Sequence, residues 1–338
     1  MVILSNYWLA ILFCIFAMIC WGSWANTQKM AQKNWRFELF YWDLIIGILI
    51  MSLIGAFTVG SMGSEGRGFV TDLKQADGSS ILHAMLGGLL WNAGNLLLVA
   101  AIAVAGMSVA FPIGGGIAWI AGIILNYINV VLKGGNPGEK PLLLWTGVAI
   151  IIGAIFLSGK SFSNMAREKK QTSLKGILLS VAGGLFIACF YPVVVNSLDA
   201  GFVTGGKGTL TPYTAVFFFA TGVFISTFLI NPFFMKKPVS GEPVRMKQYV
   251  EGNLQTHLTG VLGGAIWMLG MLFSYMAVGA ANPAIAYALS NAAPVVAILW
   301  GVLVWKEFKG APKGTGRLLS VMFISYLVGL TLITLSNS

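Results

Sequence analysis

The 338-residue chain has very little charge. Asp, Glu, Lys and Arg together make up 9% of it, while hydrophobic residues make up 57%. Soluble domains carry roughly 25% charged residues, so this shortage excludes an ordinary soluble enzyme or binding domain. Apolar runs near 20 residues in length recur down the whole chain, and runs of that length are typical of membrane-spanning helices.

Cysteine and histidine are also scarce. The three cysteines, Cys14, Cys20 and Cys189, lie inside apolar runs, which is more typical of small core residues than of a disulfide or redox pair. The sequence has no His/Cys/Asp metal spacing, no phosphate-binding glycine loop, no GxSxG and no ATP motif. We therefore expect neither an enzyme nor a bound metal or cofactor, and any transport must run on a gradient.

The apolar runs predict ten spanning helices. Each is long enough to cross a hydrocarbon core of roughly 30 Å at about 1.5 Å per residue. The first run lacks the signs of a cleavable signal peptide, so we expect it to remain as a helix. The predicted fold class is all-α integral membrane, with spans at about 7–25, 38–59, 81–104, 107–132, 141–159, 175–197, 211–235, 257–279, 283–305 and 316–335.

The net charge of +10 reflects membrane topology rather than a nucleic-acid partner. The basic residues sit in short segments between the apolar runs, with 16 of the 21 in odd-numbered loops and 5 in even-numbered ones. Cytoplasmic loops carry the excess of Lys and Arg. This bias predicts a multi-pass protein of the cell inner (plasma) membrane with odd loops in the cytoplasm and both termini outside.

A long stretch of the chain occurs twice. The run 86–127 returns in altered form at 262–303, at an offset of 176 residues. The offset superposes the following residues: Gly87 and Gly88 on Gly263 and Gly264, Trp91 on Trp267, Gly94 on Gly270, and Phe111 on Tyr287. Both copies are pairs of apolar spans interrupted by glycine, proline and a few polar groups, which is typical of the transport site of a carrier.

The duplication divides the chain into two halves of five spans. We expect a first five-helix repeat at 1–159, a cytoplasmic linker at 160–174 and a second five-helix repeat at 175–338. Because five is odd, the second half must enter the membrane from the opposite face. Such inverted repeats allow one site to be exposed to each side of the membrane in turn.

Asp43 is the leading candidate for proton coupling. It lies in the second span, about five residues from its start, where a carboxylate is costly and by default functional. A buried carboxyl can exchange a proton near neutral pH. The alternative is that Asp43 reaches the cytoplasmic interface or pairs with Arg36 or Lys33. Glu307 is expected to form an ion pair at a helix end, and His257, at the start of the eighth span, is left out of the site.

Uncharged polar and aromatic side chains inside the spans form the candidate solute site. Amides and hydroxyls at membrane depth need partners, which a neutral polar solute can supply, and aromatic faces suit a sugar or a planar heterocycle. The alternative for each is helix–helix hydrogen bonding or core packing. The candidate substrate-binding residues are Trp91, Asn92, Asn95, Trp119, Tyr191, Trp267, Tyr287, Ser290 and Asn291, with Ser274 and Tyr275 nearby.

Several motifs resemble known transporter families. The ten-span plan looks like the drug/metabolite transporter superfamily. More narrowly, the chain resembles the ureide permease family. The segments that carry this resemblance are Gly87-Gly88 through Gly94-Asn95-Leu96, Gly106-Met107-Ser108-Val109, Tyr41-Trp42-Asp43, Phe69–Leu73 with Gln75, and Leu125-Asn126-Tyr127. The related glucose/rhamnose uptake porters share Trp21-Gly22-Ser23 and Lys306-Glu307.

The resemblance implies proton-coupled uptake of a small neutral polar solute, with Asp43 at the family's acidic position. The solute would be allantoin, uracil or a related ureide in one family and a monosaccharide such as glucose, rhamnose or ribose in the other. The start Trp21-Gly22-Ser23-Trp24 departs from the ureide family's usual Gly-Thr-Trp-Pro and keeps the sugar alternative open. An exporter is a third alternative, and a scaffold or passive channel is the rival class. The expected partners are the solute, protons and the lipid bilayer, and a homodimer is left open.

Overall fold

The structure is a computed structural model that describes residues 1–165, 174–199, 207–239 and 241–337. Within these ranges it is all-helical, with an isolated β-bridge between Leu198 and Leu210 and no strand. Ten helices are long and apolar enough to span a membrane, which confirms the predicted fold class. Most of the predicted linker 160–174 lies outside the described residues.

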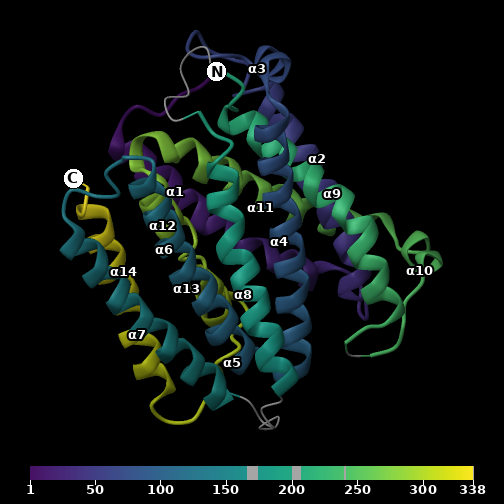
Figure 1. The fold of residues 1–338 in the computed structure, drawn as a ribbon. Helices are drawn as coiled ribbons and strands as arrows, with labels where there is room; N and C mark the ends of the chain where they lie inside the picture. Colours follow the sequence, from purple (N-terminus) through teal and green to yellow (C-terminus); the bar gives the residue numbers. More distant parts are fainter. Residues whose placement is uncertain (166–173, 200–206, 240, 338) are drawn as a thin grey trace.

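The ten spans follow the predicted ranges closely (Figure 1). They are α1 (Tyr7–Ser23) continued by η1 (Trp24–Met30), α2 (Phe37–Phe57), α4 (Gly78–Ala105), α6 (Gly116–Leu132), α7 (Pro141–Met165), α8 (Leu174–Val195), α9 (Pro212–Lys236), α11 (Leu254–Ala281), α12 (Pro283–Ser290) with α13 (Pro294–Leu299), and α14 (Thr315–Leu335). Shorter helical segments are α3 (Phe69–Gln75), α5 (Met107–Ala110), η2 (Phe111–Gly115), α10 (Met246–Val250) and η3 (Trp300–Val304).

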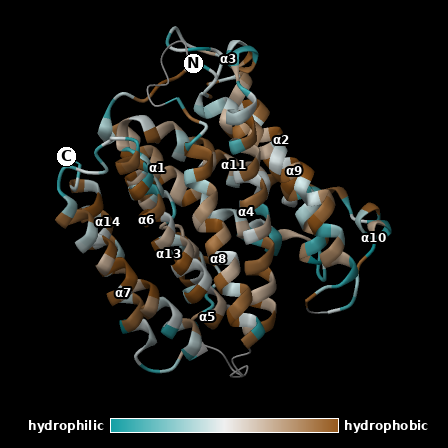
Figure 2. Cartoon of the chain, in the orientation of Figure 1, coloured by the Kyte–Doolittle hydropathy of each residue, from teal (hydrophilic) through white to brown (hydrophobic). Residues whose placement is uncertain are grey.

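The outer faces of the bundle are apolar. Large hydrophobic side chains such as Leu132, Phe156, Leu229 and Leu327 are exposed on the helices. Figure 2 shows hydrophobic residues along α7 and α14, with hydrophilic ones gathered in the loops at the helix ends. Exposed apolar surface of this extent is stable in lipid and not in water, so the chain is a multi-pass membrane protein.

The sequence repeat is also a repeat of local structure. Helices α4 and α11 are both 28 residues long, and their bounds differ by the same 176 residues that relate the sequences. Asp77 caps the start of α4 through the amide of Ser80, and Asn253 caps α11 through the amide of Thr256. Both helices end at a residue of positive φ, Gly106 at 81° and its counterpart Asn282 at 60°.

The helices of the two halves pack in the same pattern: if each helix is replaced by its repeat counterpart, the packed pairs are the same. Helix α4 packs against α8 and α9, while its counterpart α11 packs against α1 and α2. Helices α7 and α14, which are counterparts, pack against each other at one edge of the bundle (Figure 1). The counterparts α3 and α10 lie far apart, α3 at the top of the view and α10 at the right, about halfway down. The site is built where the two halves meet.

Candidate functional site

Both duplicated segments are interrupted, and the two interruptions overlap at the repeat counterparts Gly115 and Asn291. In the first half, the π-helical segment η2 contains Pro112 and leads into α6. In the second half, α12 ends at Ser290 and α13 starts at Pro294. Proline cannot donate a hydrogen bond to the preceding turn, and π-helical insertions are frequent at functional sites. Each break leaves backbone carbonyls with fewer helical partners than in a continuous helix.

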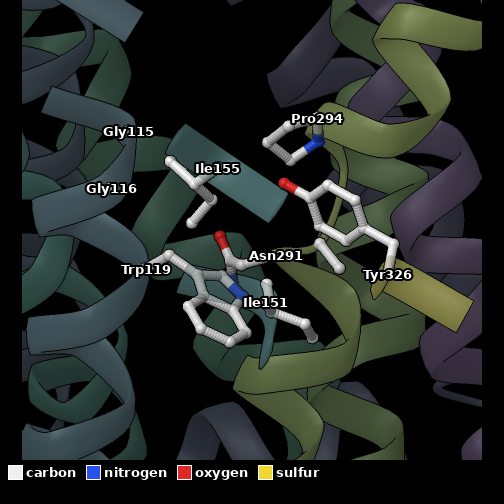
Figure 3. Close-up of a pocket in the computed structure, with 9 residues that line it drawn as sticks. Gly115, Gly116, Trp119, Ile151, Ile155, Asn291, Pro294 and Tyr326 are labelled. Atoms are coloured by element: carbon white, nitrogen blue, oxygen red, sulfur yellow. The ribbon is translucent and has the colours of Figure 1, made fainter. Parts of the chain in front are cut away.

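A small cavity lies where the breaks meet (Figure 3). Its unfilled space is about 250 Å³, of which only about 10 Å³ can hold the centre of a water molecule. That is room for a single water, so the cavity is too small to hold an organic solute in this conformation. The lining residues are Gly115, Gly116, Trp119, Ile151, Ile155, Asn291, Ala292, Pro294 and Tyr326. Gly115 and Asn291 are repeat counterparts, so each half contributes its break to the same space.

Trp119 and Asn291 are the two predicted solute residues that line this cavity. The indole N–H of Trp119 donates to the carbonyl of Ala288 at 3.1 Å, which fixes the ring. The Asn291 amide nitrogen donates to the carbonyl of Tyr287 at 3.2 Å, one helical turn earlier. Both side chains are therefore held in place from the α12 side of the cavity.

Three tyrosines form a buried cluster next to the cavity. Tyr191 stacks on Tyr275 with ring centroids 4.4 Å apart and meets Tyr287 edge-on at 5.1 Å. The Tyr191 hydroxyl lies 2.9 Å from the Ser274 hydroxyl, and Tyr287 donates to the carbonyl of Ala118 at 2.6 Å. The predicted Ser290 is fully buried, and its side chain interacts with that of Cys14. The structure thus brings Tyr191 and Tyr287, two of the candidate solute residues, into contact with each other.

The repeat-related tryptophans Trp91 and Trp267 touch, with ring centroids 4.1 Å apart. Trp267 also stacks on Trp21 and on Phe219, and the indole of Trp21 donates to the carbonyl of Trp267 at 3.0 Å. These rings pack on one another and are almost fully buried. The core-packing alternative therefore describes this pair better than a solute contact in the conformation seen here.

The asparagines of the third span are occupied by protein partners. Asn92 accepts from the hydroxyl of Tyr41 at 2.6 Å and donates to Ser226 at 2.7 Å and Thr227 at 3.1 Å. Asn92 therefore joins α4 to α2 and α9, as expected from the alternative that it serves helix–helix hydrogen bonding. Asn95 is half-buried, and its amide lies 3.5 Å from the hydroxyl of Tyr41.

Asp43 lies apart from the cavity, between α2 and α11. Its carboxylate is 2% exposed, accepts from the Tyr249 hydroxyl at 2.6 Å and lies 2.9 Å from Nδ1 of His257. Burial, together with the hydrogen bond to Asp43 and its charge, raises the pKa of Tyr249, so the phenol stays protonated as a donor. Arg36, a partner considered from the sequence, instead binds Glu38 and the carbonyl of Glu242.

Sequence reasoning left out His257 and did not consider Tyr249. The close approach of α11 to Asp43 depends on Gly260, where an added Cβ would lie only 2.4 Å from the Cβ of Asp43. One signal was available: at the repeat offset Asp43 corresponds to Phe219 and His257 to Ile81. Neither residue therefore has an ionisable counterpart in the other half. This asymmetry is unexpected if the two residues serve packing alone, and it could have indicated that they are partners.

Ion pairs tie segments together at the helix ends. Arg67, 8% exposed, binds Asp72 at 2.6 Å and Asp199 at 2.7 Å. Burial opposes the charge of Arg67, but the hydrogen bonds to the two carboxylates outweigh it and raise the pKa of the guanidinium. Glu307, just after the ninth span, pairs with Lys29. This confirms the ion pair at a helix end that the sequence predicted for Glu307.

The ten-helix fold with paired helix breaks around a shared cavity defines a multi-pass membrane transport protein. The ureide permease family model matches residues 40–177 and 165–336. The chain therefore belongs to the ureide permease family, as its motifs indicated, and members of this family are transporters and not enzymes.

Individual relatives match along nearly the whole chain. Ureide permeases 1 and 2 of Arabidopsis thaliana are each 25% identical to it, over 387 and 395 residues, covering 97% of this chain and 97% of each relative. A Lactococcus lactis protein described as a sugar uptake protein is 22% identical over 285 residues, covering 77% of this chain and 89% of its own. A crystal structure superposes with a TM-score of 0.61 and 16% identity over 98% of both chains, a likeness that shows the fold alone.

Proposed function

We propose that the chain is a secondary carrier for proton-coupled uptake of a small neutral polar solute of the ureide or nucleobase class, such as allantoin or uracil. The observation that carries the proposal is the cavity formed by two repeat-related helix breaks, with Trp119 and Asn291 in its wall. Membership of the ureide permease family supports the solute class. Tyr191, Tyr287 and Ser290 would become accessible to the solute when the cavity widens, with Trp91, Trp267, Asn92 and Asn95 in the surrounding wall.

The transport cycle follows from the duplication. The two repeats, 1–159 and 175–338, would be joined by the linker 160–174 and inserted in opposite directions in the cell inner membrane, with both termini outside. The unchanged packing on exchange of the halves and the separation of α3 from α10 support this arrangement. Rocking of one half against the other would then open the same cavity to each side in turn.

Asp43 would carry the coupling proton, with His257 and Tyr249 as its partners. The carboxylate is buried at the contact of α2 from the first half with α11 from the second. Protonation would replace a charged hydrogen-bonded contact by a neutral one at that contact. A change of this kind biases the relative positions of two packed helices, which is what coupling requires.

Monosaccharide uptake is the second candidate, favoured by the sugar uptake relative. The ring of Trp119 in the cavity wall suits the apolar face of a sugar as well as a planar heterocycle. The two candidates differ in competition, because an excess of unlabelled glucose, rhamnose or ribose should inhibit labelled uracil uptake only if sugars share the site.

The test is uphill uptake by purified protein in proteoliposomes with an acidic exterior. We expect labelled allantoin or uracil to accumulate above its external concentration, and to leak out when a protonophore removes the gradient. An internal level that never exceeds the external one for any ureide, nucleobase or sugar would overturn the proposal.

A further inference from the structure

Tyr326 is the one side chain of the cavity wall whose polar group has no assigned task. It lies in α14, is 1% exposed, and its hydroxyl has no hydrogen-bond partner in the described part of the chain. Figure 3 shows the hydroxyl aimed into the cavity, on the side opposite Trp119 and Asn291. Burying a hydroxyl that only a water in a narrow cavity can reach costs free energy. Phenylalanine would fill the same volume without that cost, so packing alone does not account for this tyrosine.

The groups around this hydroxyl supply complementary chemistry. The nitrogen of the Asn291 amide is engaged by the carbonyl of Tyr287, which leaves the amide oxygen as a fixed acceptor at the cavity. The indole N–H of Trp119 is engaged by Ala288, which leaves a flat aromatic face. Ile151 and Ile155 complete the wall with apolar surface. The cavity thus presents one acceptor, one donor and one flat face.

We propose that Tyr326 and Asn291 together recognise the planar N–H and C=O groups of a ureide or imide. The solute N–H donates to the Asn291 amide oxygen, the solute carbonyl accepts from the Tyr326 hydroxyl, and the planar group lies against Trp119. This inference rests on the proposed function and narrows its solute class, because a monosaccharide can meet the two polar groups only with hydroxyls on a puckered ring, which does not lie flat against Trp119 as a planar ureide or imide does.

The composition of the wall explains how a cavity with room for one water can admit such a solute. Trp119 and Ile155 belong to the first half of the chain, and Asn291 and Tyr326 to the second. Movement of one half relative to the other therefore separates donor and acceptor from the aromatic face and widens the space between them. The reverse movement brings the donor, the acceptor and the aromatic face back into contact with a bound solute.

The direct test compares Tyr326→Phe with Tyr127→Phe in the purified full-length protein. Tyr127 lies in α6, packs on Trp145 and likewise forms no hydrogen bond among the described residues, so it is a matched control. The readouts are the melting temperature without ligand and the affinity for uracil and allantoin from the shift in melting temperature. We expect Tyr326→Phe to melt no lower than the native protein and to bind both solutes about tenfold more weakly. The control should bind both normally.

A second measurement uses the native protein, so it holds even if Tyr326→Phe fails to fold. In 1,3-dimethyluracil both N–H groups of uracil are replaced by methyl groups, and it should give no shift where uracil does. Equal binding of uracil and its dimethyl derivative, or native affinity in Tyr326→Phe, would overturn the inference while leaving the carrier intact. Failure of the proposed function is distinct, because then the native protein binds and accumulates neither uracil nor allantoin.

Discussion

Asp43 is held by two donors at a place where an isolated charge would be unstable. Its carboxylate is contacted by the Tyr249 hydroxyl and the His257 ring, and it is nearly inaccessible to solvent. Buried carboxylates are tolerated when paired and hydrogen-bonded. The arrangement keeps an ionisable group inside the protein within reach of a titratable partner, which is what a proton site needs.

Replacing this carboxylate should separate coupling from binding. We expect Asp43→Asn to abolish uphill uptake in proteoliposomes, because an amide cannot take up and release a proton. Solute binding should persist, since Asp43 does not line the cavity. The check is accumulation under an imposed proton gradient alongside uracil-induced thermal shift, with Glu38→Gln, outside the pair with His257, as the control. Undiminished uphill uptake by Asp43→Asn would remove Asp43 from the coupling mechanism.

The sequence located the candidate site residues unevenly, for identifiable reasons. An acidic residue in an apolar span stands out, and the repeat marked Trp91 and Trp267 as counterparts but did not show that their rings touch. The partners of Asn92 on α2 and α9 could not be read, because they depend on which helices touch. Tyr326 was missed because nothing in an apolar helix marks a tyrosine whose hydroxyl lacks a partner.

At the scale of helices, glycines set how closely the halves pack. A Cβ at Gly88 would lie 2.2 Å from the carbonyl oxygen of Phe219, and one at its counterpart Gly264 would lie 1.9 Å from that of Leu44. Backbone approach of this kind is a usual means of helix association in membranes. The duplicated glycines therefore make equivalent contacts in the two halves, with α9 as the partner helix of Gly88 and α2 as that of Gly264.

Alanine at these positions should force the helices apart. We expect Gly88→Ala and Gly264→Ala each to destabilise the protein by about 1–3 kcal/mol, the usual cost of overpacking. Gly153, in α7, has open space around it, so Gly153→Ala should be neutral or slightly stabilising through helix propensity. Melting temperatures in one detergent provide the comparison. An equal fall in melting temperature at all three positions, whatever their contacts, would argue against this packing.

The Arg67 network fixes the segment after α2 to the segment before α9. The sequence does not reveal this network, because Asp199 is 132 residues away from Arg67 along the chain. Removing one member of a buried ionic group leaves its partners uncompensated, at a cost of about 3–5 kcal/mol. We expect Arg67→Gln to lower the melting temperature markedly. Lys74→Gln, a charge removed from the neighbouring helix α3, should have little effect; equal losses in the two variants would mean that the network is unimportant.

For the whole molecule, hydrophobic run length predicted the ten spans. Most ends agree within three residues, but the first, fourth and fifth spans differ by five at one end. The fourth does so because α5 and η2 interrupt the run before α6. Breaks of this kind depend on contacts with other helices, which apolar composition alone does not reveal.

The proposed orientation makes a labelling prediction. Ser64 and Lys309 are both exposed and lie in loops assigned to opposite sides of the membrane. We expect Ser64→Cys to react with a membrane-impermeant maleimide in intact cells and Lys309→Cys only after permeabilisation. The native cysteines lie within the apolar spans and provide the background. The reverse pattern would invert the topology, and labelling of both from outside would contradict a ten-span arrangement.

Counterflow tests the central claim most directly, since a carrier exposes one site to each side in turn and a channel does not. Proteoliposomes are preloaded with excess unlabelled uracil or allantoin and diluted into a trace of the labelled solute without a proton gradient. The account predicts transient accumulation of label inside, with a rate that saturates with solute concentration. Linear, non-saturating entry with no transient accumulation would contradict it and identify a passive pore.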